Sequence, residues 1–501
     1  MRHLHSIVVL TALALFVAAG TSVARQGEPP YSLTHPTKVG FNLAIEDLGS
    51  IDAAALLRDA DRALRAPGMQ VKRAQVAESL ATAVAPTLQG RIDNLPDGSQ
   101  LWRARVRVSG ATDLRLGFDV FRLPTGASLH VIGADDYWQG PYTIADDNDG
   151  RFEAPVLPGD SAIIELHVPA GQSIEAGQLR LGVVGAGFRD VFGRSKIGQP
   201  GASGECNIDV VCDLGQPYAD EIRAVAYIEF RNDDDGQYYM CSGTLLADVP
   251  RTRKNWFLTA GHCIDSAAEA NSISVYWNYQ STRCQSLGMP TGGFFKDNQS
   301  GAWLRAARAD VDFSLLELKE APAAAWNVYR AGWDATNTTP SGTIGIHHPS
   351  GDVKKITAGP RPATIRNCTV YGGPANTHWQ TGPYSQGTTE GGSSGSGLFA
   401  PAGAGDGARR LIGMLSGGNA QCSSSAPTRP DNGGDCYGKF AIAWDGASAD
   451  QRLRDWLDPD HTGTRSIPGG TTAPAEPVSQ RPPLDTPSIL RQLPHRRATR
   501  P

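Results

Sequence analysis

The chain has 501 residues, of which 40% are hydrophobic and 19% are charged, and its formal net charge at pH 7 is −5. This composition is that of a globular protein, and the length exceeds that of a typical single domain. Because the chain is slightly acidic, it gives no electrostatic reason to bind nucleic acid, and we exclude nucleic acid as the expected partner.

The first 24 residues have the three-part plan of a secretory signal peptide. MRHLH is basic, SIVVLTALALFVAA is apolar, and TSVA places small residues at Ser22 and Ala24. The apolar run is shorter than the roughly 20 residues that a membrane-spanning helix needs. We therefore expect cleavage after Ala24 and a secreted protein without a membrane anchor.

Residues 25–196 contain no cysteine and are predicted to form a separate β-rich unit. IDAAALLRDADRALRA has alanine and leucine at helical spacing. In LWRARVRVSG, apolar residues alternate with Arg103, Arg105 and Arg107, as in a half-buried strand. LRLGFDVFRLP and SAIIELHVPAG repeat the pattern of a strand followed by a turn.

All eight cysteines lie within residues 197–460, which are predicted to form an all-β barrel or sandwich. AVAYIEF, ISVYWNY and FSLLEL are short apolar strands between glycine-rich turns, and ASADQRLRDWL indicates a C-terminal helix. An even number of cysteines in an exported chain favours disulfides over zinc, since no CxxC pair is present. Residues 461–501 are rich in proline and arginine and are predicted to be a disordered tail.

Two short motifs supply a candidate base and a carboxylate to orient it. WFLTAGHC places His262 beside Cys263, where a disulfide would hold the backbone that carries the imidazole. DVDFSLLELK places Asp312 at the mouth of a buried strand, with Asp310 as its competitor. A general base must lie about 3 Å from the proton it takes, and a buried carboxylate would fix the tautomer of the imidazole.

The stretch EGGSSGSG (390–397) offers two candidate nucleophiles. The GxSxG pattern of α/β-hydrolases selects Ser393, whereas the pattern G-x-S-G-S selects Ser394, with the backbone N–H groups of Gly392 and Ser394 as an oxyanion hole. Chain order favours Ser394, because His262, Asp312 and Ser394 follow the order of chymotrypsin-like enzymes. The alternatives are a flexible linker and an esterase or lipase of α/β type, which the order of the residues and the lack of alternating helices argue against.

The three motifs are similar to the signatures of trypsin-fold serine endopeptidases. Further segments resemble bacterial lysyl endopeptidases, namely GECNIDVVC, VYWNYQSTRC, AGWD, IHHP and DWLDP. The resemblance covers about residues 201–460 and implies a double β-barrel protease domain with a C-terminal helix. In that domain His262 is the general base, Asp312 is its orienting partner and Ser394 is the nucleophile.

The resemblance also implies a set of disulfides. Three pairs match the family: Cys206–Cys422, Cys212–Cys284 and Cys241–Cys263. This leaves Cys368 and Cys436, which we expect to pair with each other. His347 and His348 lack a visible third ligand for a metal, so we expect a structural or pocket-rim role for them, and we expect neither a metal nor a cofactor.

For specificity, the resemblance implies an aspartate at the base of the pocket that receives the side chain before the cut bond. DCYGK supplies Asp435, with Asp431 as its rival in PDNGGD. A buried carboxylate there would pair with an incoming ammonium or guanidinium. Ser416, which precedes Gly417 in the pocket, and Tyr371 stand where the family has a histidine and a tryptophan. We therefore expect a preference for basic residues, with lysine preferred and arginine possible.

Residues 25–196 resemble a pro-region that blocks the cleft and assists folding. Cutting after Lys196 would begin the enzyme at Ile197, whereas the start of the family matches Gly201. Ser393 stands where pancreatic-type trypsins have an aspartate that receives the new N-terminus. The expected partners of this monomer are protein and peptide substrates and its own pro-region, without membrane or nucleic acid. A non-catalytic binding protein of the same fold is the alternative.

Overall fold

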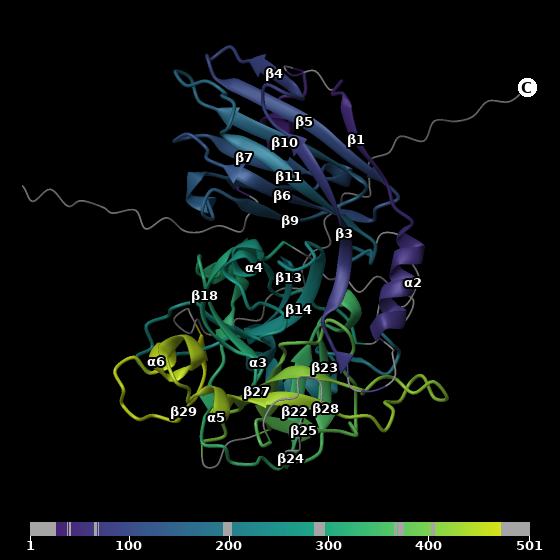
Figure 1. Ribbon diagram of the computed structural model, residues 1–501, viewed down its shortest axis with the longest axis vertical. Helices are drawn as coiled ribbons and strands as arrows, with labels where there is room; N and C mark the ends of the chain where they lie inside the picture. Colours follow the sequence, from purple (N-terminus) through teal and green to yellow (C-terminus); the bar gives the residue numbers. More distant parts are fainter. Residues whose placement is uncertain are drawn as a thin grey trace, which may run out of the picture.

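The computed structural model describes residues 27–471 except 38, 40–41, 65–67, 69, 194–202, 285–295, 365–367, 369–374 and 402–405. Figure 1 shows two parts stacked along the long axis, with the purple and blue N-terminal strands above the teal, green and yellow remainder. The predicted signal peptide and the predicted junction at Lys196, Ile197 and Gly201 lie outside the described residues. Within those residues, no helix has both the length and the apolar character needed to cross a membrane.

The N-terminal part is built from two sheets that enclose a common core. The first sheet contains β1 (Ile45–Ser50), β5 (Gln100–Ser109), β10 (Ser161–Val168), β7 (Ser128–Ile132) and β8 (Trp138–Tyr142) in that order, with β4 (Arg91–Asn94) also paired to β5. The second contains β3 (Ala74–Val84), β11 (Leu179–Gly187), β6 (Asp113–Phe121) and β9 (Phe152–Pro158). Trp102, Val106 and Val108 of β5 are buried in this core, as their alternation predicts.

The second part contains two barrel-like sheets, the first of which continues through β3 from the second sheet of the N-terminal part. The first uses β13 (Val225–Arg231), β14 (Tyr238–Leu245), β15 (Trp256–Thr259), β16 (Ser274–Tyr276), β17 (Asn298–Ser300), β18 (Ala302–Arg308) and β19 (Phe313–Leu318). The second uses β12 (Ile208–Asp209), β22 (Thr343–His347), β23 (Lys355–Gly359), β24 (Ala363–Thr364), β25 (His378–Thr381), β26 (Gly397–Ala400), β27 (Arg410–Gly418) and β28 (Asp435–Lys439). The prediction of an all-β fold with a double barrel after a β-rich unit is confirmed.

Among the described residues, the helices are short apart from α2, which has 12 residues. They are α1 (Tyr31–Thr34), α2 (Ala53–Leu64), α3 (Ala219–Ala224), α4 (Ala267–Ser272), α5 (Phe440–Ala443) and α6 (Arg454–Leu457). The helix predicted from IDAAALLRDADRALRA is α2. The C-terminal helix is present only as the single turn α6, because Arg452 is extended and separates it from the 3-10 turn at Ala449–Gln451.

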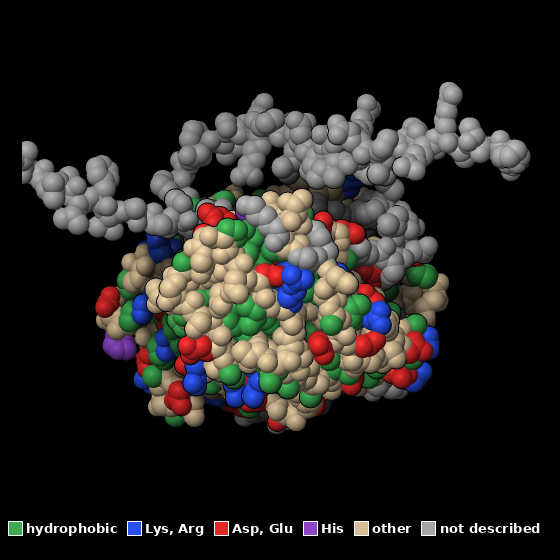
Figure 2. Space-filling view, turned by 90° about the horizontal axis from the view of Figure 1, so that it is seen from above, with side chains coloured by type: hydrophobic (Ala, Val, Ile, Leu, Met, Phe, Trp, Pro, Cys, Tyr) green, Lys and Arg blue, Asp and Glu red, His purple; other side chains and the backbone are tan. Residues whose placement is uncertain are grey.

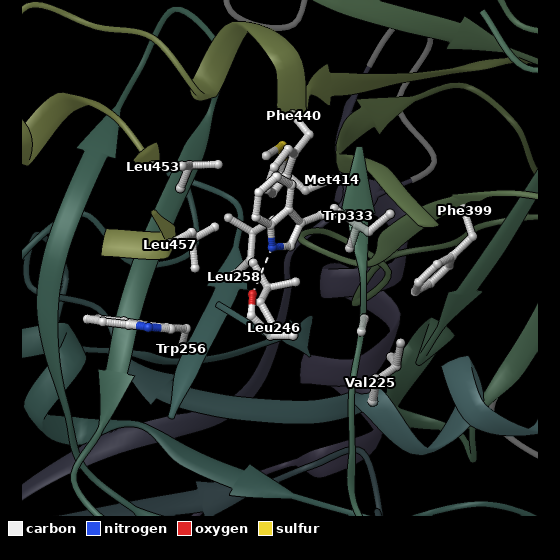
Figure 3. Packing of buried hydrophobic residues seen from close by; sticks show 14 of the residues in the cluster. Val225, Leu246, Trp256, Leu258, Trp333, Phe399, Met414, Phe440, Leu453 and Leu457 are labelled. Carbon is white, nitrogen blue, oxygen red and sulfur yellow. Dashed lines mark hydrogen bonds between the residues drawn. The ribbon is translucent and has the colours of Figure 1, made fainter. Parts of the chain in front are cut away.

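A large apolar core lies where the two barrels meet (Figure 3). Trp333 is fully buried there, its ring centroid is 4.5 Å from that of Trp444, and its indole N–H donates to the carbonyl of Ala247 at 2.7 Å. Leu453 and Leu457 are buried in the same core. It fixes the two barrels against each other and so fixes the groove between them.

The beginning of the predicted tail is folded. Strand β29 (Ser466–Ile467) pairs with β21 (Trp333–Asp334), and β30 (Gly470–Thr471) pairs with β20 (Tyr329–Arg330). The prediction of disorder is therefore wrong for residues 461–471, because Ile467 is buried in the same core and Trp333 lies on the strand that pairs with it. Residues 472–501 lie outside the described residues.

Strand β3 joins the two parts, since it pairs with β11 on one edge and with β14 on the other. In Figure 1 it runs from the upper part down into the lower one. Seen from above, the outer face of the N-terminal part has acidic and basic side chains interspersed (Figure 2). On its inner face, the N-terminal part carries charged side chains that are buried as a pair against the first barrel.

That buried pair joins Arg115 of β6 to Glu229 of β13. The guanidinium donates to both carboxylate oxygens at 2.7 and 2.8 Å, and the Tyr227 hydroxyl donates to the same carboxylate at 2.6 Å. Burial alone lowers the pKa of Arg115, but Glu229 and Asp113 raise it well above its ordinary value. The N-terminal part is thus held on the barrel by a charged, fully paired contact as well as by apolar packing.

Candidate active site

Three elements bring His262, Asp312 and Ser394 together. His262 follows β15, Asp312 precedes β19 in the same barrel, and Ser394 precedes β26 of the other barrel. His262 Nε2 is 2.7 Å from Ser394 Oγ, and His262 Nδ1 is 2.9 and 3.1 Å from the two carboxylate oxygens of Asp312. The backbone N–H of His262 also donates to Asp312, at 2.9 Å. Asp310 is elsewhere, paired with Arg308.

Glycines shape the turn that carries Ser394. Gly392 has φ +95°, and a Cβ at this position would lie 2.5 Å from Met240 Cε and 2.8 Å from the carbonyl of His348. The backbone N–H groups of Gly392 and Ser394 point to one acceptor, the carbonyl oxygen of Lys72, at 2.5 and 3.3 Å. The two donors predicted for an oxyanion hole therefore converge on a single peptide carbonyl.

Lys72 belongs to the N-terminal part, and its side chain fills the pocket beside Ser394. Its ammonium forms an ion pair with Asp435 at 2.9 Å, donates to the carbonyls of Thr389 at 3.0 Å and Ala420 at 2.8 Å, and also contacts the Thr389 hydroxyl. The sequence offered one weak signal for Lys72, namely that lysine is scarce in the chain. Lys72 is one of three lysines before residue 197. No motif distinguished Lys72 from the other two.

Asp435, rather than Asp431, lies at the base of this pocket. Its carboxylate is fully buried and accepts from the Tyr384 hydroxyl at 2.7 Å and the Thr389 hydroxyl at 2.6 Å. Burial and the nearby Asp435 raise the pKa of Tyr384 well above its usual range, so it remains a donor. Asp431 is instead partly exposed, and it accepts the backbone N–H groups of Gly433 in its own turn and of Gln421 in the neighbouring segment.

The segment around Lys72 lies extended across the groove. Strand β2 (Gln70–Val71) pairs antiparallel with β27, Val71 opposite Gly417 and Gln70 opposite Gly418. A Cβ on Gly417 would collide with the backbone of Gln70, so the strand pairing needs glycine there.

On the other side of Lys72, the Arg73 guanidinium donates to the carbonyl of His262 at 3.0 Å and lies 4.6 Å over the Tyr239 ring. The next residue, Ala74, pairs with Met240 of β14. Backbone contacts on both sides therefore align the Lys72 carbonyl with Ser394.

The two remaining residues predicted for the pocket are Ser416 and Tyr371. Ser416 is fully buried, and its hydroxyl is 3.1 Å from Nε2 of His378, a residue that the sequence gave no reason to select. The described contacts of the Lys72 ammonium do not include Ser416. Tyr371 lies outside the described residues.

The turn around Ser394 is tied down by residues that sequence reasoning did not assign to it. Ser393 Oγ is 2.8 Å from His347 Nδ1, and burial, followed by the charges of Lys72 and Lys355, lowers the pKa of His347 to about 3. The backbone N–H of Ser242 donates to the Ser394 carbonyl at 2.7 Å.

The Ser242 hydroxyl also donates to the carbonyl of Gly392 at 3.0 Å and accepts from the backbone N–H of His348 at 3.0 Å. These bonds hold the peptide groups adjacent to those whose N–H groups face Lys72. The two histidines are thus buried within the protein framework, in keeping with the structural role expected for them.

The three family disulfides are present, and one of them supports the site directly. They are Cys206–Cys422, Cys212–Cys284 and Cys241–Cys263. The last ties the loop of His262 to β14. Among the described residues, Cys241, His262 and Cys263 lie close enough together to be considered as metal ligands. Both cysteine sulfurs belong to this disulfide, however, and so offer no thiolate.

The predicted fourth disulfide is not formed. Cys368 and Cys436 are both buried as free cysteines. The side chain of Cys436 is hydrogen-bonded to Cys368, and this bond, together with burial, raises the pKa of the Cys436 thiol. The two residues are neighbours, as their expected pairing requires, but they interact as thiols.

Both parts of the chain match models of known protein families. Residues 47–184 match the family model of the lysyl endopeptidase N-terminal domain, and residues 200–438 match that of the lysyl endopeptidase C-terminal domain. A lysyl endopeptidase from Pseudomonas aeruginosa is 32% identical over 443 residues, which cover 82% of this chain and 89% of that protein.

Solved structures with similar coordinates are more distant in sequence. The secreted serine protease VesC from Vibrio cholerae is 16% identical with a TM-score of 0.31, covering 48% of this chain and 46% of VesC. The active form of the Rv3671c protease from M. tuberculosis is 14% identical with a TM-score of 0.29, covering 45% of this chain and 79% of that protease.

Proposed function

The chain belongs to the lysyl endopeptidase family and is a serine endopeptidase, and on this premise we propose that it cleaves peptide bonds after lysine with Ser394, His262 and Asp312. The observation that supports this proposal most directly is the position of Lys72. Its ammonium meets Asp435 in a buried pocket while its carbonyl oxygen accepts from Gly392 and Ser394. A peptide in this position presents the bond after a lysine to Ser394.

The geometry supplies each step of an acyl-enzyme reaction. His262 Nε2 takes the proton of Ser394 Oγ as this oxygen attacks the carbonyl carbon. Asp312 holds Nδ1 and stabilises the imidazolium, and the N–H groups of Gly392 and Ser394 stabilise the oxyanion. The imidazolium then protonates the leaving amine, and water hydrolyses the ester with His262 again acting as the base.

The pocket favours lysine over arginine. The Lys72 ammonium contacts Asp435 directly and is surrounded by Thr389 and Ala420 oxygens, which suits a compact group with three rotatable donors. A guanidinium is longer and planar, so it requires the base of the pocket to move. We therefore expect arginine to be cleaved with lower kcat/KM by about 10- to 200-fold, the range for a misfit of this size.

We also propose the roles of the segments outside the barrels. Residues 1–24 direct secretion, residues 25–196 are the pro-region, and the chain after residue 471 is a tail. The separate matches of the two family models support a boundary between residues 184 and 200. The occupation of the groove by Lys72 supports inhibition of the precursor by its own pro-region, because a substrate peptide needs the same pocket.

Digestion of a mixed-peptide library by the processed protein and by its Ser394→Ala variant tests the proposal. We expect cuts after lysine, far fewer after arginine, and none with the variant. A processed protein that is folded but cuts nothing contradicts the proposal and favours a non-catalytic binding role. The same cuts with Ser394→Ala would mean that another residue is the nucleophile.

A further inference from the structure

We infer that the Lys72–Arg73 peptide bond is a self-cleavage bond, cut by Ser394 of the same molecule, and that both new ends stay bound so that the cut precursor remains inhibited. This inference rests on the proposed function. It assigns a specific internal processing site to the pro-region, distinct from the junction between residues 184 and 200 that would free the enzyme.

The first support is that the bond lies in the orientation of a substrate. The Lys72 carbonyl oxygen accepts from the N–H groups of Gly392 and Ser394, and His262 Nε2 is already 2.7 Å from Ser394 Oγ. Residues before the bond pair with β27 and residues after it pair with β14, so the chain has the same direction on both sides. The catalytic groups and the bond are thus assembled before any cut has been made.

The second support is that the turn around Ser394 needs no new N-terminus to form. Ser393 is held by His347, and Ser242 holds the carbonyls of Gly392 and Ser394. All of these partners belong to the uncut chain. The oxyanion hole is therefore formed in the precursor, as a self-cleavage step requires.

The chemical step is a hydrolysis that consumes one water. Ser394 Oγ bonds to the Lys72 carbonyl carbon, the bond to the Arg73 nitrogen breaks, and His262 transfers the serine proton to that nitrogen. Water then attacks the ester, which leaves a carboxylate on Lys72, an amine on Arg73 and a restored Ser394. No other reactant is needed.

The end that begins at Arg73 is held on the first-barrel side of the groove. Its guanidinium donates to the His262 carbonyl and lies over Tyr239, and β3 continues directly into the sheet between β14 and β11. The amine of Arg73 therefore stays beside the ester and competes with water to remake the peptide bond. This slows net hydrolysis and keeps part of the population uncut.

The end that finishes at Lys72 is also held. Its ammonium remains in the Asp435 pocket, and its own strand β1 is paired in parallel with β5 of the other fragment. The backbone N–H of Ile51 donates to the carbonyl of Ser109 at 2.9 Å, and the N–H of Gly27 donates to the carbonyl of Gly140 at 3.1 Å. A single cut at this bond therefore leaves two fragments folded around each other in the groove.

The test uses the full-length precursor, its Ser394→Ala variant, and Lys72→Gln with Lys296→Gln as the matched control. Lys296 is an exposed lysine to which no role in the site has been assigned. We expect intact-mass and N-terminal analysis to find a fragment that begins at Arg73 in the wild type and in Lys296→Gln. The fragment should be absent from Ser394→Ala and from Lys72→Gln.

Two further measurements test whether the cut occurs within one molecule and whether the ends stay bound. The rate constant of cutting should not change on dilution, and processed wild-type enzyme added in trace should leave Lys72–Arg73 intact in Ser394→Ala, since the bond is buried in that molecule's own groove. The two fragments should elute together on gel filtration, and an active-site titrant should not react with the nicked precursor.

Each other outcome overturns a stated part of the inference. An uncut bond in a precursor whose processed form cleaves lysyl peptides contradicts the cleavage but leaves the proposed function standing. Cutting of Ser394→Ala by added enzyme contradicts cleavage within one molecule. Separation of the fragments, or reaction with the titrant, contradicts the anchoring of the ends. If the processed form cleaves no peptide at all, the proposed function itself fails.

Discussion

Replacing Asp435 by Asn tests the pocket with almost no change in shape. The carboxylate is fully buried, 2.9 Å from the lysine ammonium, and it is the one anionic group among the ammonium's described contacts. Loss of one partner from a buried ion pair costs about 3–5 kcal/mol, because the other charge is left uncompensated.

The lower end of that range applies here. The carbonyls of Thr389 and Ala420 still accept from the ammonium after the substitution, so its protons are not left without acceptors. A loss of about 3 kcal/mol corresponds to a decrease of about 150-fold in kcat/KM, since about 1.4 kcal/mol is tenfold.

The assay compares processed enzyme on three peptide substrates that differ only in having lysine, arginine or norleucine before the cut bond. With Asp435→Asn, we expect the lysine substrate to lose about 150-fold, while the norleucine substrate is unchanged or improved because it no longer leaves a buried carboxylate unpaired. The matched control is Asp431→Asn, which removes a carboxylate from a partly exposed turn and should leave the lysine substrate unaffected.

The opposite pattern would refute the assignment. If Asp431→Asn abolishes the lysine preference and Asp435→Asn does not, the pocket has been assigned to the wrong aspartate. An equal loss on lysine and norleucine substrates with Asp435→Asn would indicate a general defect in folding or catalysis, and thermal unfolding of both variants checks this.

Three further changes test the framework around the site. Ser242→Ala removes the bonds to Gly392 and His348 and should lower kcat by about tenfold with little change in KM, as measured on the lysine substrate; an unchanged kcat would contradict the support role. Arg115→Met leaves Glu229 buried and uncompensated, and urea unfolding of the precursor should show a loss of about 3–5 kcal/mol, much of it recovered when Glu229 is also replaced by Leu. His347, with its pKa lowered to about 3, should make the unfolding free energy fall by up to about 1.4 kcal/mol per pH unit as the pH drops from about 6.5 towards 3, because the unfolded imidazole binds a proton that the folded one does not. A His347→Gln precursor with an equally steep pH profile would show that His347 is not responsible.

Local motifs predicted the triad, and distant contacts explain what they missed. His262, Asp312 and Ser394 each stand in a short segment whose strand and turn pattern is visible in the sequence, so their residue types and order were sufficient to select them. Lys72 has no such pattern, because its partner Thr389 is 317 residues away and the pairing exists only once two folded parts meet. Tyr384 and His378 were missed for the same reason.

Predictions from composition were wrong where a few individual side chains determine the structure. Residues 461–501 are poor in apolar groups, yet Ile467 alone joins the core between the barrels and brings β29 with it. The cysteine count predicted that Cys368 and Cys436 are neighbours, and they are, but proximity in the fold does not by itself oxidise two thiols. Both cases depend on local chemistry that a residue count does not contain.

The manner in which the precursor is restrained follows from the residue that precedes the serine. An aspartate at position 393 would need a cation, and a new N-terminus could supply it only after a cut elsewhere. Ser393 is neutral and is satisfied by His347, which burial also keeps neutral, so the turn of Ser394 is stable in the uncut chain. On the proposed function, we therefore expect activity to be controlled by occupation of the groove rather than by ordering of the turn. We therefore expect activation to depend on removal of the lysine from the pocket, and not on formation of the new N-terminus of the enzyme.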